Sequence, residues 1–246
     1  MIPKIIHFCW FGKNEMPIEI QTCIDSWKKH LPSYEFILWN EENFDINSTL
    51  FTKQAYEVKK YAFVSDYVRL YALNKYGGIY LDTDQEIVKP IDEFLSHRMV
   101  TGFDDGNGII SCFIGAEKAH PCISNLLDFY GELNFINSDG SYNEIPNTIW
   151  IQNLMKEKYG LVLNGKNQVL IEGIHIYSED FFHCKSLITG KINVTKNTYA
   201  IHHHTLLWVS RKTLIIKFIR QNIIVPIIGK NRYLMLSNLI KGVSNE

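Results

Sequence analysis

The stretch YGGIYLDTDQEI, residues 76 to 87, joins a double glycine, a short apolar run and two aspartates one residue apart. Residues 78–81 predict a buried strand, and Asp82 and Asp84 follow at its carboxyl end, the edge at which α/β sheets bind ligands. A carboxylate is costly to bury unless it is paired. A divalent cation such as magnesium or manganese would satisfy both aspartates. A solvated Asp-Thr-Asp turn is the alternative.

The sequence on either side of this stretch alternates between strand-like and helix-like patterns. Strands are predicted at residues 4–11, 34–39, 78–81, 86–90, 99–102, 109–114, 174–177 and 198–202. Helices are predicted at residues 18–30, in a segment that ends at residue 76, at 122–135 and 147–159, and in two parts of 212–241 divided at Pro226 and Gly229. The early β-α-β-α-β order implies parallel strands with helices on both faces, an α/β fold.

Composition limits the classes of function. The chain has 246 residues, of which 46% are hydrophobic and 21% charged, as in a globular protein. A net charge of −1 argues against nucleic acid as a partner. The five cysteines match no disulfide or zinc spacing, which favours a reducing compartment. The N-terminus lacks the pattern of a signal peptide, and no apolar run is long enough to span a membrane.

The segment 211–246 differs from the rest of the chain in charge. It holds seven basic residues and one acidic residue, a net charge of +6, between the apolar stretches LIIKFI, IIVPII and YLMLSNLI. Two interpretations stay open. The apolar residues pack against the domain and leave the basic ones in solvent, or the segment anchors the protein on the cytoplasmic face of a membrane.

The helix that precedes the aspartates reads YAFVSDYVRLYALNKYGG and is apolar nearly all round, which predicts a buried helix. Asp66 and Arg69 lie three residues apart within it, on one face. A buried ion pair adds little stability, because desolvation offsets most of the attraction. The pair is therefore either structural or part of a polar patch that binds the hydroxyl groups of a ligand.

The run FVSDYVRLYALNKYGGIYLDTD resembles the signature of the glycosyltransferases with a sugar-binding DxD segment. That family includes bacterial capsule and O-antigen transferases and fungal Golgi mannosyltransferases, and the catalytic domains of the large glucosylating bacterial toxins are similar. IPKIIHFCWFG at residues 2–12 and YAIHHHTLLW at 199–208 resemble its opening and closing segments. The resemblance implies a GT-A domain over residues 1–210, followed by a basic, largely helical extension over 211–246.

The resemblance also implies roles for the residues of the matched run. The donor would be a UDP-sugar. Asp84 would bind the metal directly, and Asp82 would bind it directly or through water and touch the donor. Asp66 and Arg69 would hydrogen-bond the donor sugar, and Ser65 is counted with them as donor-binding.

The opening segment supplies a candidate for the nucleotide base. Trp10 matches the aromatic residue that stacks on uracil in the toxin relatives, and Cys9 would add backbone contacts beside it. The alternative is that Trp10 is an ordinary core residue at a strand end. His7, in the same strand, is interpreted as a core histidine whose hydrogen bonds are satisfied.

The closing segment contains His202, His203 and His204. In a strand His202 and His204 face one way and His203 the other. The family pattern covers His202 and His203, so one of them is expected to contact the metal or the diphosphate. His204 stands where the family often has an aromatic residue. Trp208 matches the family tryptophan, whose indole N–H would reach the diphosphate.

The sequence therefore predicts a Mn²⁺- or Mg²⁺-dependent glycosyltransferase. It would move a hexose or N-acetylhexosamine from a UDP-sugar to a glycan or lipid-linked glycan, with retention by same-face attack. The expected setting is bacterial capsule or O-antigen synthesis, in the cytoplasm or peripherally on the inner membrane face. The alternatives are a metal-dependent phosphotransferase or hydrolase of nucleotide diphosphates and a non-catalytic sugar-binding module.

Overall fold

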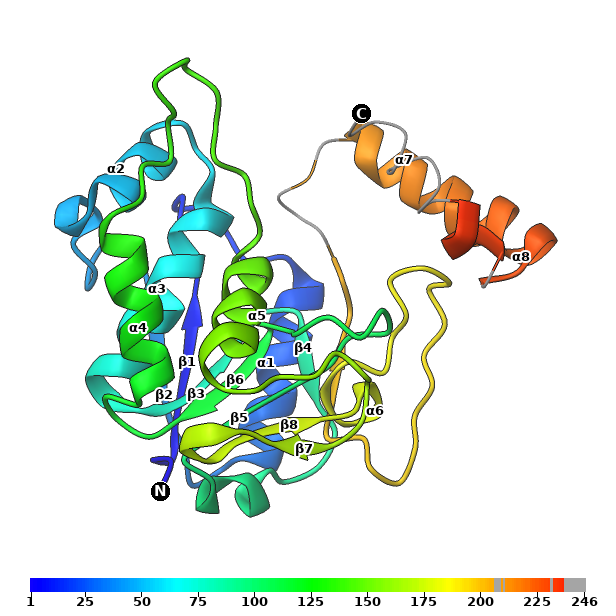
Figure 1. Cartoon of the computed structure of the whole chain (residues 1–246), viewed down its shortest axis with the longest axis horizontal. Coiled ribbons are helices and arrows are strands. Elements are labelled where there is room, and N and C mark those ends of the chain that lie inside the picture. The colour runs from blue at the N-terminus through cyan, green and yellow to red at the C-terminus, as the bar shows by residue number, and fades with distance from the viewer. Residues whose placement is uncertain (206–208, 210, 231, 237–246) are drawn as a thin grey trace.

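The computed structural model describes residues 1–205, 209, 211–230 and 232–236. A seven-stranded mixed sheet forms the centre of the molecule (Figure 1). β6 and β7 run antiparallel to their neighbours, and the other strands run parallel. The strand order is β2 (Glu35–Trp39), β1 (Ile5–Cys9), β3 (Gly78–Leu81), β6 (Phe113–Ala116), β5 (Met99–Gly102), β8 (Ile174–Tyr177) and β7 (Gln168–Val169).

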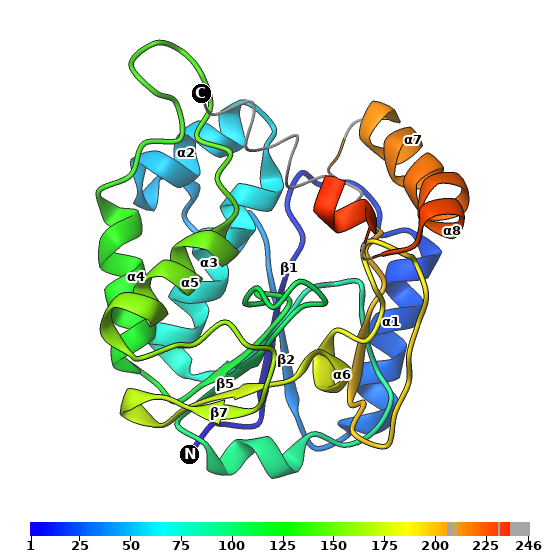
Figure 2. The ribbon, with the colours of Figure 1, turned by 45° about the vertical axis from the view of Figure 1, so that its right-hand side comes forward.

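Helices cover both faces of this sheet, so the predicted α/β fold is confirmed (Figures 1 and 2). Each face buries its own cluster of apolar side chains, centred on Val64 and Val68 on one side and on Trp27 and Phe94 on the other. One face carries α2 (Leu50–Glu57), α3 (Tyr61–Tyr76), α4 (Pro121–Gly131) and α5 (Asn147–Lys158). The other face carries α1 (Ile18–His30), a 3₁₀ turn at Asp92–Ser96 and α6 (Glu179–Phe182).

The double glycine places β3 directly after α3. Gly77 ends α3 with a φ of 68°, and Gly78 begins β3 with a φ of 112°. A Cβ atom on Gly77 would lie 2.7 Å from the backbone nitrogen of Lys118, and one on Gly78 would lie 2.6 Å from the carbonyl oxygen of Ile5. Glycine is required at both positions because positive φ and close backbone approach exclude a side chain. The tight turn pairs β3 with β1 and carries Asp82 to the edge of the sheet.

Two predicted strands differ from the structure. The expected fourth parallel strand is β4 (Gln85–Ile87), which pairs antiparallel with β9 (Ala200–His202) in a separate two-stranded sheet. The turn at Asp82–Asp84 directs the chain out of the main sheet, where the Gln85 N–H donates to the Asp82 carbonyl at 2.9 Å. The strand predicted at 109–114 begins only at Phe113.

The C-terminal segment is helical; it is divided at Gly229 as predicted, whereas the helix continues through Pro226. α7 (Arg211–Ile219) continues through a π-helical turn (Arg220–Ile224) into α8 (Val225–Ile228), which contains Pro226 in its first turn. A π-turn is a common way to accommodate a hydrogen bond that proline cannot make. The chain leaves the helix at Gly229, with a φ of 83°. No helix in the described part of the chain is both long and apolar enough to cross a membrane.

Candidate functional site

Asp82 and Asp84 lie at the carboxyl end of β3 with His202, the last residue of β9. One oxygen of each carboxylate and one ring nitrogen of His202 lie within 4.8 Å of one another. The His202 Nε2 atom is 3.1 Å from Asp84 Oδ1 and 4.0 Å from Asp82 Oδ2. The antiparallel pairing of β4 with β9 brings these residues together across 118 positions of sequence. The structure therefore places His202, one of the two histidines predicted as metal contacts, beside the predicted carboxylate pair.

Hydrogen bonds hold the carboxylate of Asp84 in its charged form. The side chain is nearly buried, and its Oδ2 accepts from the Thr205 backbone N–H at 2.8 Å and the Thr205 hydroxyl at 3.1 Å. Burial would raise the pKa of Asp84, but the charge and hydrogen bond of His202 and the bonds from Thr205 lower it well below its usual range. Asp84 is thus an anion at neutral pH, ready to meet a cation.

Arg69 is the centre of a second cluster, which joins the first at Asp82. Its Nη2 atom is 2.9 Å from Asp66 Oδ1 and 3.3 Å from Asp82 Oδ1, while Nη1 donates to the Ser111 carbonyl at 2.9 Å. The guanidinium lies 4.6 Å from the ring centre of Tyr80. The Asp66–Arg69 pair predicted from the sequence is therefore present, and it also contacts the first aspartate of the DxD.

Asp66 sits at the amino end of α5. Burial raises the pKa of Asp66, while Arg69 and a hydrogen bond from the backbone N–H of Asn147 lower it. The side chain of Asn147 is buried, and its Nδ2 has no hydrogen-bond partner in the described structure. Sequence reasoning did not single out Asn147, because an asparagine that follows a proline at a helix start is a common local pattern.

Trp10 is half-buried and belongs to neither hydrophobic core cluster, so the interpretation of Trp10 as a core residue is wrong. Its indole Nε1–H donates to the Asn14 carbonyl at 2.6 Å. Cys9 is buried beside Tyr80 and Ser65, and burial raises the pKa of its thiol to about 12. These residues lie around the end of β1, next to the strand that carries Asp82.

The three histidines of the closing segment divide as the strand geometry predicts. The ring centres of His202 and His204 are 4.1 Å apart, whereas the Nε2 of His203 is 2.8 Å from Glu86 Oε2. Of the two histidines predicted as metal contacts, His202 is the one that lies with the aspartates. The prediction for Trp208 falls outside the described residues.

The donor set fits a divalent cation. Two carboxylates supply the hard oxygen ligands that magnesium and manganese prefer, and an imidazole nitrogen is compatible with manganese. The group is open on one side, because about a quarter of the Asp82 side chain (26%) is exposed. Residues Asp82, Asp84 and His202 are therefore the candidate ligands of a metal that also contacts a ligand from solvent.

Residues 17–101 match the model of a family described as the glycosyltransferase sugar-binding region containing the DXD motif. The matched range contains Asp66, Arg69, Asp82 and Asp84. The resemblance predicted from the sequence motif is thus confirmed: this part of the chain is similar to the sugar-binding region of that glycosyltransferase family.

Among curated relatives, inositol phosphoceramide mannosyltransferase 3 of Schizosaccharomyces pombe is 33% identical over 49% of this chain and 35% of the relative. In Saccharomyces cerevisiae, mannosyl phosphorylinositol ceramide synthase CSH1 is 31% identical over 49% of this chain and 33% of its own length. The synthase SUR1 is 24% identical over 84% of this chain and 56% of its own length. The matched part of this chain thus spans about a third to a half of the length of these relatives.

Two solved structures with a similar arrangement are both glycosyltransferases by name. The PaToxG glycosyltransferase is 21% identical, with a TM-score of 0.48 over 64% of this chain and 70% of the other. The galactosyltransferase LgtC is 10% identical, with a TM-score of 0.40 over 81% of this chain and 87% of the other.

Proposed function

We propose that this protein is a metal-dependent glycosyltransferase that uses a nucleoside-diphosphate sugar. The observation that carries the proposal is the continuous group formed by Asp66, Arg69, Asp82, Asp84 and His202 at the carboxyl edge of the sheet. It places a guanidinium–carboxylate pair, suited to sugar hydroxyls, directly beside a candidate metal site. Of these residues, all but His202 lie within the matched DXD region.

Each residue then has a distinct task. Asp82, Asp84 and His202 would hold a Mn²⁺ or Mg²⁺ ion, which as a Lewis acid stabilises the diphosphate that leaves. Arg69 and Asp66 would orient the donor sugar through paired hydrogen bonds, with Ser65 on the same helix. Trp10 would stack on the base. These groups bind the donor so that its anomeric carbon faces an acceptor hydroxyl.

Retention of the anomeric configuration belongs to the same proposal. All three carboxylates of the site already have partners, since Asp66 and Asp82 pair with Arg69, and Asp84 pairs with His202 and Thr205. A carboxylate so engaged is a poor nucleophile for a covalent sugar intermediate. The proposed route is therefore attack by the acceptor on the face from which the diphosphate departs.

The identities of the donor sugar and of the acceptor are further parts of this proposal. A UDP-sugar carrying a hexose or N-acetylhexosamine is the donor proposed from the sequence, and the curated relatives, named as mannosyltransferases, add mannose as a candidate. Those relatives act by name on inositol phosphoceramide, a lipid. The acceptor that we propose is a lipid-linked glycan of a cell-surface polysaccharide.

A panel of UDP- and GDP-linked sugars tests the activity. With Mn²⁺ or Mg²⁺ present and water as the default acceptor, one donor should be consumed, and chelator should stop the reaction. The released sugar should keep the α configuration by NMR. Nucleotide diphosphates split with no sugar release would instead favour the phosphohydrolase alternative. Metal-independent sugar binding without turnover would favour the binding module.

The structure also bears on the location of the enzyme, because the C-terminal helix exposes its apolar residues. Lys217 Nζ donates to the His204 carbonyl at 2.7 Å, and Arg220 and Gln221 both donate to the Leu187 carbonyl at 2.8 Å. Eight apolar side chains of α7, the π-turn and α8 are between 38% and 76% exposed: Leu214, Ile215, Ile216, Phe218, Ile219, Ile223, Ile224 and Ile227. Val225 is buried, so the expected packing on the domain holds for Val225 and not for these eight residues.

We propose that this outward apolar surface docks on an anionic lipid membrane. This helix directs polar side chains to its own domain and apolar side chains to solvent. Such an apolar face is suited to insertion into the interface of a lipid membrane. The basic residues of the segment, including exposed Lys212 and Arg232, complement anionic headgroups and each contribute about 1 kcal/mol near such a surface. A peripheral position on the cytoplasmic face of a membrane would bring the enzyme to a lipid-linked acceptor.

Vesicle flotation tests the docking. The protein should float with phosphatidylcholine vesicles that contain phosphatidylglycerol, and high salt should weaken the binding. Ile215→Ser with Phe218→Ser should abolish it. Val162→Ser with Ile171→Ser, two positions of similar exposure (58% and 60%), should not. Failure to float, or self-association through the same helix seen by sedimentation without vesicle binding, would contradict the proposal.

A further inference from the structure

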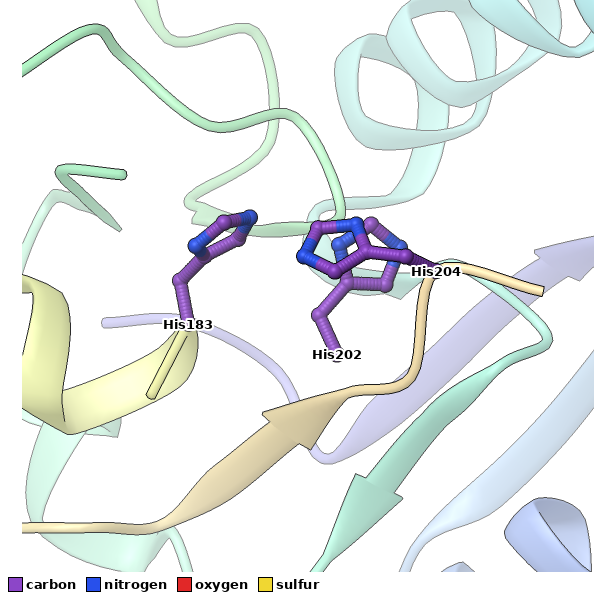
Figure 3. Close-up of side chains that lie close together, drawn as sticks. All are labelled: His183, His202 and His204. Carbon is purple, nitrogen blue, oxygen red and sulfur yellow. The ribbon is translucent and has the colours of Figure 1, made fainter. Parts of the chain in front are cut away.

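Three histidine side chains meet beside the carboxylate site (Figure 3). His183 follows α6, His202 ends β9, and His204 lies just beyond it. Their ring centres are 4.1 Å apart for His202 and His204, 4.6 Å for His183 and His204, and 5.4 Å for His183 and His202. One ring nitrogen of each lies within 4.8 Å of one ring nitrogen of the other two. We call this group the three-histidine cluster.

We propose that the three-histidine cluster binds a transition-metal ion such as Zn²⁺. Imidazole nitrogens suit zinc and its neighbours in the first transition row, and three histidines with an open position form a well-known kind of zinc site. This site adjoins the oxygen-rich one at Asp82 and Asp84 and shares His202 with it: Nε2 of His202 is 3.1 Å from Asp84 Oδ1, and Nδ1 has no hydrogen-bond partner in the described structure. It goes beyond the proposed transfer reaction, because nothing in that reaction uses His183 or His204.

Hydrogen bonds outside the cluster orient its rings as metal ligands require. A ligating histidine usually donates its other N–H to a carboxylate or a backbone carbonyl. His202 Nε2 is 3.1 Å from Asp84 Oδ1, and His204 Nε2 donates to the Lys185 carbonyl at 3.0 Å. These bonds leave Nδ1 of each ring as the atom that can take the metal.

His183 gives a second, independent observation that points to a bound ligand: one of its buried ring nitrogens has no hydrogen-bond partner in the described structure. Only 6% of this residue is exposed, yet its Nδ1 has no hydrogen-bond partner in the described structure. A buried polar atom without a partner costs about 1–3 kcal/mol. A metal bound at this nitrogen would remove that cost.

The charges near the cluster act in both directions. Asp84 adds a negative charge beside His202. Lys217 donates to the His204 carbonyl, and its positive charge opposes a cation. Imidazole nitrogens with one nearby carboxylate favour a transition-metal ion over magnesium.

Cobalt(II) titration of the metal-stripped, full-length protein tests the site, because cobalt replaces zinc and reports its ligands by its visible spectrum. One equivalent should give the intense bands of a nitrogen-rich, four- or five-coordinate site, and Zn²⁺ should displace it. His183→Gln and His204→Gln should lose these bands. His203→Gln, a neighbour that faces Glu86, should keep them, as should Asp82→Asn in the carboxylate site.

Each result has one meaning. Absence of the bands in the wild-type protein overturns the proposal, and so does a His183→Gln protein that keeps them. Loss in Asp82→Asn with retention in His183→Gln would place the metal at the carboxylates instead. If His183→Gln and His204→Gln fail to fold by circular dichroism, X-ray absorption of the zinc-loaded wild-type protein decides. Three imidazoles bound to the zinc ion support the site, and two or fewer overturn it.

Discussion

At the scale of single residues, Arg69 connects the parts of the site. Its guanidinium contacts Asp66, Asp82 and the Ser111 carbonyl and is almost fully buried, with 6% of the side chain exposed. The sequence predicted the pairing with Asp66 from a spacing of three on one helix. It did not predict the contact with Asp82, because that contact depends on how α3 packs against the end of β3. Arg69 therefore joins the candidate sugar-binding pair to the candidate metal site.

Replacing the ion pair separates a structural role from donor binding. The single variant Arg69→Met leaves buried Asp66 unpaired and should lower the free energy of unfolding by about 3–5 kcal/mol. The double variant Asp66→Leu with Arg69→Met should recover much of that loss and still be inactive. Urea unfolding and donor turnover are the measurements. An active double variant would show that the pair serves only the fold.

Trp10 offers a flat, half-buried face for the base. Trp10→Ala should weaken nucleotide affinity by about 1–3 kcal/mol through lost stacking, with little change in melting temperature. Trp10→Phe keeps an aromatic face but loses the N–H bond to Asn14, and should bind better than the alanine variant. Calorimetric titration with nucleoside diphosphate measures both. Unchanged affinity in Trp10→Ala would remove Trp10 from the site.

At the scale of elements, the sequence predicts those helices, strands and turns whose conformation depends mainly on their own residues. The β3 strand, the buried helix α3 and the glycines between them follow from apolar patterning and from the need for positive φ. The pairing of β4 with β9 and the arrival of His183 beside His202 depend on contacts across long sequence separations. A single sequence carries no direct signal for such contacts, so the carboxylates were predicted and the three-histidine cluster was not.

The glycine turn gives a test at this scale. Gly78→Ala should destabilise the protein by about 2 kcal/mol or more, because its Cβ would meet the Ile5 carbonyl at a φ of 112°. Gly131→Ala, at the end of α4 with no atom within 4 Å of the added Cβ, is the control and should be neutral or slightly stabilising. Thermal unfolding compares them. Equal effects would contradict the role assigned to the turn.

At the scale of the whole molecule, stability should depend on pH through buried neutral histidines. His7 is fully buried, donates from Nε2 to the Gly77 carbonyl at 2.8 Å and accepts from Trp39 Nε1 at 3.2 Å. The prediction that His7 is a satisfied core histidine is confirmed. Burial lowers its pKa, although the bond to Gly77 raises it. The unfolded chain therefore binds a proton more readily than the folded one, and His7 stabilises the fold above its unfolded pKa.

The contribution of His7 to the free energy of unfolding should accordingly fall as the pH decreases from about 7.5 to about 5, through the unfolded histidine pKa of about 6.5. His120 contributes in the same direction, because burial lowers its pKa as well. His7→Gln should show a smaller fall than the wild-type protein. Urea unfolding at each pH measures the slope. An identical slope in His7→Gln would refute the assignment.

The central claim is that Asp84 anchors the metal that binds the donor diphosphate. Its direct test is calorimetric titration of nucleoside diphosphate with and without Mn²⁺, in wild type, Asp84→Asn and Glu86→Gln. The amide oxygen introduced by Asp84→Asn would still accept the bonds from Thr205, so the fold should persist, and Glu86, which faces His203, is the matched control. Wild type and Glu86→Gln should show Mn²⁺-dependent binding, and Asp84→Asn should lose it by about 100-fold or more. Mn²⁺-dependent binding of wild-type strength in a folded Asp84→Asn protein would contradict the claim.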